Sequence, residues 1–194
     1  MRDTGTMKGR ARRFGAPAIL AALIAVVALA AADQRQRSFA WLRPQAVPQH
    51  WGTAAVPSGA RLAYPPGWRL IHSDRGTVSA SPALPAGPFA GYLNVTPRQG
   101  DETLANWRRF RVSHLVEERA QLVHFEGGAN RLRFRSGEGS CVMDHYSTTR
   151  ARFREIACLV AGGHGLSVIV AAAPIHTWSA QAPVLERAIS SFGT

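Results

Sequence analysis

The two cysteines of the chain, Cys141 and Cys158, are the residues whose spacing points most directly to chemistry. They stand in two strand-like runs on either side of residues 149 and 150, which fit a two-residue hairpin loop. In that hairpin Cys141 lies directly opposite Cys158, at a separation that a disulfide can bridge. The sequence therefore predicts a structural disulfide. Two free buried thiols or a redox-active pair are the alternatives, although the spacing is far from Cys-x-x-Cys.

Histidine is a second residue type with catalytic or metal-binding capacity, and the chain has seven. None of them forms a His-x-x-x-His pair, a Cys/His cluster or a His-Glu-x-x-His helix. Asp144 and His145 are adjacent, so on a strand their side chains point to opposite faces and cannot act together. Ser167 lacks the Gly-x-Ser-x-Gly turn of hydrolases. We therefore expect no catalytic residue, no metal ligand and no cofactor.

Arginine supplies a third kind of chemistry, because its guanidinium fork matches the oxygens of carboxylates and phosphates. Arg131, Arg133 and Arg135 alternate with apolar residues and therefore share one face of a predicted strand. Arg108 and Arg111 lie on a predicted helix. These five residues form the candidate anion-binding patch, and an ordinary solvated polar face is the alternative.

An uncharged apolar run, residues 14–32, follows a basic flank at residues 1–13. As a helix the run would be about 28 Å long, close to the thickness of a bilayer core. Because basic flanks stay in the cytoplasm, the sequence predicts a single-pass transmembrane anchor in the cell membrane with the rest of the chain outside the cytoplasm. The alternative is a signal peptide cleaved after Ala30 or Ala32, which would leave a secreted or periplasmic protein. Either compartment is oxidising and favours a disulfide.

The net charge of +11 is unevenly distributed along the chain. Residues 1–52 carry eight basic and two acidic groups, whereas residues 53–194 carry fifteen basic and ten acidic groups. More than half of the excess therefore belongs to the membrane segment and its flanks. We expect the partners to be the membrane, through residues 14–32, and an anionic lipid, an envelope polymer or a protein, but no nucleic acid.

Apolar periodicity and turn residues predict the elements that would position these side chains. Residues 33–52 are polar and contain proline, which indicates a linker, and residues 53–194 are long enough for one domain with its own core. Residues 127 and 128, both glycine, are expected to form a turn. Strands are expected at 60–64, 68–72, 77–81, 92–96, 122–126, 130–135, 140–147, 153–161 and 166–172.

Two helices are expected in the domain. The first begins at Asp101, whose carboxylate would cap the free amides of the first turn, and ends near Arg119. The second runs from about Ser179 to Phe192, with Pro183 in its first turn, where a missing amide donor costs little.

The order of these elements resembles a known family. A short strand followed by Tyr-Pro-Pro-Gly-Trp at 64–68, a strand ending in Tyr-Leu-Asn-Val-Thr at 92–96 and a Leu-x-x-Trp helix resemble the PsbP-like α/β sandwich. So does the end of the chain, where a strand leads into Trp178 and a helix that closes on Ile-Ser-Ser-Phe at 189–192. The resemblance covers about Trp51 to Phe192. It implies an α+β fold in which an antiparallel sheet of about six or seven strands packs with two main helices.

The PsbP-like family includes the extrinsic PsbP protein of photosystem II, a Ran-binding nuclear transport factor and many exported bacterial domains. The resemblance therefore implies a fold and a non-enzymatic role, but no ligand. We expect a membrane-tethered, extracytoplasmic binding or accessory module of the bacterial cell envelope. The alternatives are an envelope hydrolase, which a polar pocket joining His114, His124 or His145 to a carboxylate would favour, and an accessory subunit of a larger membrane complex, which a large exposed apolar patch would favour.

Overall fold

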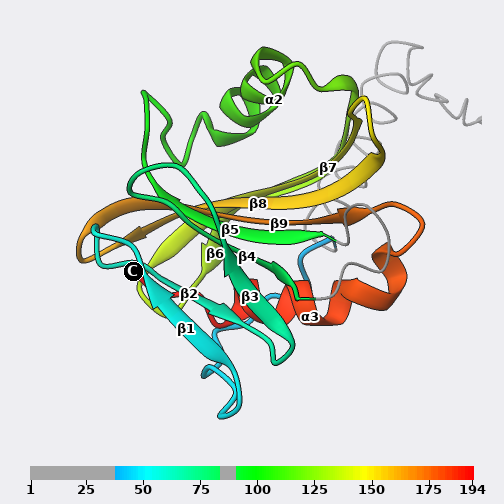
Figure 1. The fold of residues 1–194 in the computed structure, drawn as a ribbon. Helices are drawn as coiled ribbons and strands as arrows, with labels where there is room; N and C mark the ends of the chain where they lie inside the picture. Colours follow the sequence, from blue (N-terminus) through cyan, green and yellow to red (C-terminus); the bar gives the residue numbers. More distant parts are fainter. Residues whose placement is uncertain (1–37, 84–90) are drawn as a thin grey trace, which may run out of the picture. The chain divides into compact units, whose positions relative to one another are not determined.

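The computed structural model describes residues 38–83 and 91–194, which form one α+β domain (Figure 1). A seven-stranded antiparallel sheet has the strand order β3-β4-β5-β9-β8-β7-β6. Helices α2 (Trp107–Glu117) and α3 (Trp178–Ser190) pack on its opposite faces. The predicted architecture, a sheet of six or seven strands with two main helices, is confirmed. The strands of the sheet are β3 (Trp68–Ile71), β4 (Val78–Pro82), β5 (Tyr92–Pro97), β6 (Gln121–Arg133), β7 (Glu138–Ser147), β8 (Arg152–Gly162) and β9 (Gly165–Pro174).

The α3 side of the sheet holds the main apolar core. Along β8, Ile156, Cys158 and Val160 alternate toward α3, as the two-residue period of a strand requires. Leu185 and Ile189 of α3 are fully buried against them. A separate two-stranded sheet is formed by β1 (Gly52–Ala55) and β2 (Arg61–Tyr64). It packs against this core through β2, whose Leu62 is fully buried there.

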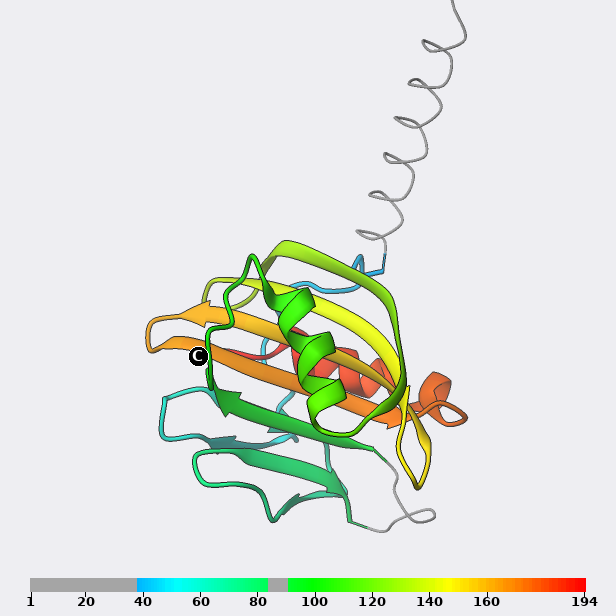
Figure 2. The same cartoon turned by 90° about the horizontal axis from the view of Figure 1, so that it is seen from above.

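The opposite side of the sheet is only partly covered. Helix α2 packs on β6 and β7, and its Trp107 indole donates a hydrogen bond to the Ala157 carbonyl of β8 at 3.0 Å. Figure 2 shows that the strands at the other end of the sheet, β3 and β4, carry no helix on this side. The two faces of the sheet are therefore covered by different helices. The cleft described below lies beside the shorter helix, α2.

The first helix begins at Trp107, six residues later than the predicted start at Asp101. The Glu102 carboxylate instead accepts hydrogen bonds from the backbone amides of Gln99 and Gly100, both at 2.7 Å, which holds residues 99–102 in a loop. The prediction that Asp101 caps the helix is therefore wrong. Helix α3 starts at Trp178, close to its predicted start, but Pro183 lies inside the helix and the helix ends at Ser190.

Strand β6 is continuous where the sequence predicts a turn. Gly127 and Gly128 pair with Met143 and Val142 of β7, and the register shifts between Phe125 and Gly127. Such bulges insert a residue without ending the strand. A side chain at Gly128 would come within 3.1 Å of the Cys141 carbonyl, so glycine here serves close backbone approach rather than a turn.

The segment predicted as a linker, residues 33–52, is described from Ser38 on, and that part packs on the domain. The Phe39 side chain is 2 % exposed and belongs to the α3-side core. The Gln45 amide donates a hydrogen bond to the Ser190 carbonyl at the end of α3. The predicted flank and anchor, residues 1–13 and 14–32, lie outside the described residues. Within the described residues, no helix has the length and hydropathy that a membrane span needs.

Candidate functional site

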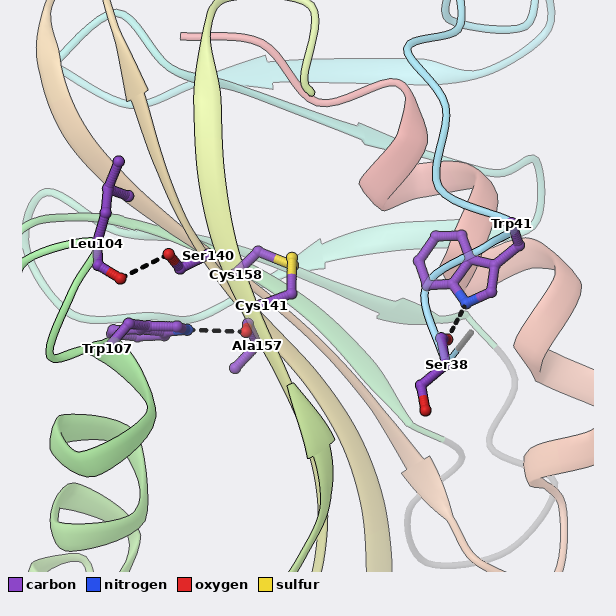
Figure 3. The surroundings of a disulfide bond; sticks show 8 residues. All are labelled: Ser38, Trp41, Leu104, Trp107, Ser140, Cys141, Ala157 and Cys158. Carbon is purple, nitrogen blue, oxygen red and sulfur yellow. Dashed lines mark hydrogen bonds between the residues drawn. A yellow bond between two sulfur atoms is a disulfide. The ribbon is translucent and has the colours of Figure 1, made fainter. Parts of the chain in front are cut away.

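The predicted disulfide is present and is structural. Cys141 of β7 and Cys158 of β8 are direct partners in the ladder, with their Cα atoms 4.1 Å apart, and their sulfurs are bonded. Both residues are almost completely buried on the α3 side. Figure 3 shows the sulfurs on one side of these strands and Trp107 on the other. Because neither sulfur is free or accessible, the redox-active alternative has no support.

The five arginines of the predicted anion-binding patch do not share one surface. Arg108 lies on α2 with its guanidinium carbon 3.7 Å from the centre of the Phe125 ring. Arg131, Arg133 and Arg135 are exposed in or just after β6. Arg111, however, is only 7 % exposed and points into the domain. Its place in the patch is therefore a wrong prediction, because the side chain is used for a buried ion pair.

That ion pair joins α2 to the middle of the sheet. Nε and Nη2 of Arg111 both lie 2.7 Å from Oε1 of Glu155, which is fully buried in β8. The Tyr146 hydroxyl donates to the other Glu155 oxygen at 3.4 Å. Asp144 of β7 faces Glu155 across the ladder, so strand alternation places both carboxyl groups on the α2 side. The Arg111 guanidinium is therefore buried on the same side of the sheet as the carboxyl groups of Glu155 and Asp144.

The Asp144 carboxyl group has no described hydrogen-bond partner at either oxygen and is 0 % exposed. Burial raises its pKa to about 8, and the negative charge of Glu155 adds to the rise, whereas Arg111 opposes it. Burial likewise raises the pKa of the Tyr146 hydroxyl, followed by the charge of Glu155. In the cluster of Arg111, Glu155, Asp144 and Tyr146, this rise in pKa favours the neutral form of the Asp144 carboxyl group at neutral pH, beside the Arg111–Glu155 ion pair.

A polar cleft of about 180 Å³ opens beside α2. One wall is the helix, where Trp107, Phe110 and His114 form a ladder of stacked rings with centroids 6.0 and 5.8 Å apart. The facing wall is β5, whose alternate residues Asn94 and Thr96 line the cleft. Helical spacing on one side and strand alternation on the other thus bring an aromatic wall opposite an amide and hydroxyl wall.

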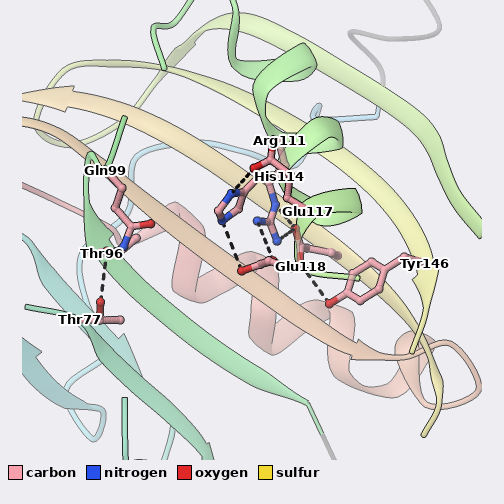
Figure 4. A network of polar contacts seen from close by, with 9 residues as sticks. Thr77, Thr96, Gln99, Arg111, His114, Glu117, Glu118 and Tyr146 are labelled. Carbon is pink, nitrogen blue, oxygen red and sulfur yellow. Dashed lines mark hydrogen bonds and ion pairs between the residues drawn. The ribbon is translucent and has the colours of Figure 1, made fainter. Parts of the chain in front are cut away.

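The polar groups of the β5 wall are hydrogen-bonded to each other. Oγ1 of Thr96 lies 3.2 Å from both the Thr77 hydroxyl and the Gln99 side-chain amide. The Asn94 amide donates to the Ser79 hydroxyl at 2.8 Å. Figure 4 shows Thr77, Thr96 and Gln99 on one side and the charged residues of α2 on the other.

The charged groups that reach the solvent at this cleft are mainly acidic. Asp74 and Glu118 are exposed and line it, whereas the Arg111 guanidinium is committed to Glu155. Nε2 of His114 lies 3.3 Å from Glu118, and its Nδ1 lies 3.8 Å from Glu117 on the same helix. The cleft therefore differs in charge from the domain around it, which is basic.

Hydrolysis by covalent catalysis would need a nucleophilic side chain next to a base. The His114 ring contacts carboxylates of its own helix, and neither Thr77 nor Thr96 is hydrogen-bonded to it. The second His–carboxylate contact, His145 Nδ1 to Glu126 at 2.9 Å, lies on the α3 side of the sheet, opposite to Asp144. In the described part of the chain, no group of three or more His, Cys, Asp or Glu residues is arranged to hold a metal ion.

Sequence reasoning missed the buried cluster and the β5 wall of the cleft. A signal for the cluster was present, because Asp144 and Glu155 interrupt strongly apolar strands and Arg111 falls on the apolar stripe of its helix. Charged residues at such positions are almost never buried unless they are paired. The β5 wall gave no signal, since asparagine and threonine on a half-buried strand are common.

Comparison with known proteins finds likeness in fold alone. No family model matches the chain, and no curated protein matches its sequence. The solution structure of the cyanobacterial PsbP protein CyanoP from Synechocystis sp. PCC 6803 has a TM-score of 0.56 at 13% identity, covering 75% of this chain and 92% of that one. LpqN of Mycobacterium tuberculosis, described as involved in cell envelope biogenesis, has a TM-score of 0.48 at 15% identity, covering 75% and 91%. The described domain thus has the PsbP-like fold that its sequence resembles.

Proposed function

We propose that this PsbP-like domain is the extracytoplasmic part of a membrane-tethered, non-enzymatic binding module of a bacterial cell envelope. The apolar run at residues 14–32 has the length and basic flank of an anchor. The buried Cys141–Cys158 disulfide suits an oxidising compartment outside the cytoplasm. The fold supports an accessory role only weakly, because one fold serves many functions.

The observation that carries the proposal is the cleft between α2 and β5. It is open to solvent and lined by side chains that can both stack and form hydrogen bonds, among them Phe110, His114, Asn94 and Gln99. Aromatic surface combined with a few polar groups is typical of small-ligand sites. With about 180 Å³, the cleft has room for one small polar group of a larger envelope molecule.

The charges of the cleft restrict the kind of ligand. Asp74 and Glu118 would repel an anion, and the Arg111 guanidinium is not free to bind one because it pairs with Glu155 and also lies 3.9 Å from Glu118. The ligand group is therefore neutral or cationic. This departs from the anionic ligand that the predicted arginine patch would favour.

Three probes with the same sugar ring and different charge test this preference: glucosamine (cationic), N-acetylglucosamine (neutral) and glucuronate (anionic). We expect them to shift the NMR signals of α2 and β5 in the full chain, held in a nonionic detergent, with affinities in that order. Glu118→Gln should weaken glucosamine binding about two- to fivefold, the effect of one exposed charge. Glu138→Gln, an exposed carboxylate outside the cleft, is the matched control. Tightest binding of glucuronate would contradict the proposal.

An envelope hydrolase is the second candidate, and the 3.3 Å contact between His114 and Glu118 in the cleft is the observation that favours it. A hydrolase would lose its activity on an ester or glycoside substrate when His114 is replaced by alanine. For a binding module, the original chain has no hydrolytic activity, and His114→Ala changes only the affinity for the probes.

The third expectation, a subunit of a larger complex, depends on an apolar patch. Among the described residues, the exposed large apolar side chains come from β3, α2, β6 and the segment after β9, and β3 and β6 are opposite edges of the sheet. These side chains therefore cannot form one patch, and no observation favours this function. They are Leu70, Val116, Leu122 and Ile175.

A further inference from the structure

A second hollow, with a volume of about 520 Å³, lies beside the β1–β2 sheet near the C-terminal end of the chain. Figure 1 shows the C-terminus next to these two strands. Segments far apart in the sequence form its walls: Arg61 of β2, Arg135 and Ser136 after β6, His164 in the β8–β9 turn, and Thr194. We call this hollow the basic groove. Its volume falls within the range typical of small-molecule sites.

Contacts between the walls fix the position of the basic groove. The Arg61 amide donates to the Gly193 carbonyl at 3.0 Å, and the two residues form an antiparallel bridge. Gly59, with φ of +88°, lies so close to His164 that a Cβ there would be 2.7 Å from its ring. Thr194 in turn packs against Gly162, where a side chain would collide with its hydroxyl. Backbone hydrogen bonds and close packing between these segments therefore hold the walls of the groove in place.

The charge of the basic groove is opposite to that of the cleft beside α2. Arg61 and Arg135 are both exposed, and neither forms an ion pair with a described residue. No Asp or Glu side chain lines the groove within the described residues.

Two hydroxyl groups on the groove walls lack the partner that buried polar atoms normally have. The oxygen atoms Oγ of Ser136 and Oγ1 of Thr194 are buried and have no described hydrogen-bond partner. Because both oxygens are buried, they shape the wall of the groove and are not counted among the groups that contact a ligand. Both residues line the groove, and the Thr194 hydroxyl packs against Gly162.

We propose that the basic groove binds a phosphate group, held by the guanidinium groups of Arg61 and Arg135 and by the exposed ring of His164. A phosphate presents several oxygens in a tetrahedron and accepts two-pronged hydrogen bonds from more than one guanidinium. A single carboxylate offers only two oxygens and would leave donors unpaired. The phosphate is either a free anion or the headgroup of a lipid, because both present the same oxygens.

This site replaces the anion-binding patch that sequence alone predicts. Of that patch, only Arg135 lines the groove, whereas Arg131 and Arg133 are exposed elsewhere on the same strand region. The groove also shares no lining residue with the cleft beside α2. A negative result for phosphate binding in the groove would therefore not contradict the proposed ligand binding in the cleft.

The test is a titration of the full chain with inorganic phosphate, followed by NMR and held at constant ionic strength with chloride. The protein is kept once in nonionic micelles and once in nanodiscs of phosphatidylcholine with or without phosphatidylglycerol. The variants are Arg61→Gln, Arg135→Gln and the matched control Arg133→Gln. Since all three side chains are exposed, none should disturb folding.

We expect saturable shifts at the β1–β2 turn, the β8–β9 turn and residues 191–194. Arg61→Gln and Arg135→Gln should each weaken binding about tenfold, the effect of one charge-assisted hydrogen bond, and Arg133→Gln should leave it unchanged. Saturation by free phosphate in micelles supports a free anion, and shifts that appear in nanodiscs of either lipid composition before phosphate is added support a lipid headgroup. Shifts that do not saturate, or an equal loss in Arg133→Gln, would overturn the proposal, because they mean diffuse attraction to surface charge.

Discussion

The two faces of the seven-stranded sheet are built from different interactions. On the α3 side, apolar side chains from the helix, the sheet and the β1–β2 sheet form one core, and the disulfide lies within it. On the α2 side, a smaller apolar cluster around Trp107 borders a buried ion pair and a polar cleft. The buried residues of α3 are Trp178, Leu185, Ala188, Ile189 and Ser190, and those of α2 are Trp107, Arg111 and Leu115.

This difference indicates a division of labour. Apolar burial stabilises without direction, so the α3 face can be filled completely and gains most from it. A buried ion pair contributes little net stability but fixes the position of α2 over the sheet. The α2 face therefore buries fewer apolar side chains than the α3 face, but the fixed position of α2 gives the cleft an ordered wall. The predictions below separate stability on one face from binding on the other.

The largest effect is expected from breaking the buried ion pair. Arg111→Met leaves Glu155 as an uncompensated buried charge next to Asp144, which should cost about 3–5 kcal/mol of unfolding free energy. Urea unfolding monitored by tryptophan fluorescence measures it. The double variant Arg111→Met with Glu155→Gln removes both charges and should recover most of the loss. A double variant as unstable as the single one would show that the guanidinium acts by packing.

Removing the disulfide should be the next largest effect, and it acts on the other face. The bond closes a loop with a sequence separation of 17, for which loop entropy gives roughly 3 kcal/mol. Cys141→Ala with Cys158→Ala should lower the free energy of unfolding by about that amount. If the two faces are independent, combining this pair with Arg111→Met should give an additive loss. A clearly non-additive result would mean that the faces are coupled through β7 and β8.

The pH dependence of stability should carry the signature of Asp144. The pKa of this carboxyl group is about 8 in the folded domain and about 3.9 in an unfolded chain, so only the folded state holds the proton between these values. Its stabilising contribution is complete below pH 4 and is lost as the pH rises toward 8, at about 1.4 kcal/mol per pH unit. In urea unfolding between pH 5 and 7, Asp144→Asn should show a correspondingly shallower decline than the original chain. Parallel curves would mean that Asp144 is ionised in the fold.

The smallest effect on stability is expected in the cleft itself. Glu118 is exposed, and its basic neighbours are His114 Nε2 at 3.3 Å and Arg111 Nη1 at 3.9 Å. Glu118→Gln should change the free energy of unfolding by less than about 0.5 kcal/mol. Thermal unfolding of this variant beside Glu138→Gln measures the difference. A large loss would place Glu118 in the framework of the fold instead of in a binding surface.

The parts of this fold that depend on local pattern could be predicted from sequence. The β7–β8 hairpin is an example, because a two-residue loop fixes the register and hence the Cys141–Cys158 pairing. The start of α2 could not be predicted, since Asp101 is a good cap by type and the loop that excludes it depends on how Glu102 is buried. Gly127 and Gly128 are common in turns, and only their pairing with β7 shows that they form a bulge.

The sites were harder to predict than the fold, because both are formed by residues distant in sequence. Arg111 belongs by spacing to a group of helix arginines, and only the packing of α2 on the sheet turns it toward Glu155. Likewise, Arg61, Arg135 and His164 come from three elements that meet only when β2 pairs with the end of the chain. The pattern of a single sequence relates residues that are close along the chain, whereas these contacts join residues that are far apart in it.

The most direct test of the account is the affinity of glucosamine for the variant that lacks the disulfide, measured well below its unfolding temperature. Stability on the α3 face and binding on the α2 face are separate in this account. Cys141→Ala with Cys158→Ala should therefore bind glucosamine as tightly as the original chain, while Glu118→Gln binds it two- to fivefold more weakly at unchanged stability. A loss of affinity in the disulfide variant as large as that in Glu118→Gln would contradict the account.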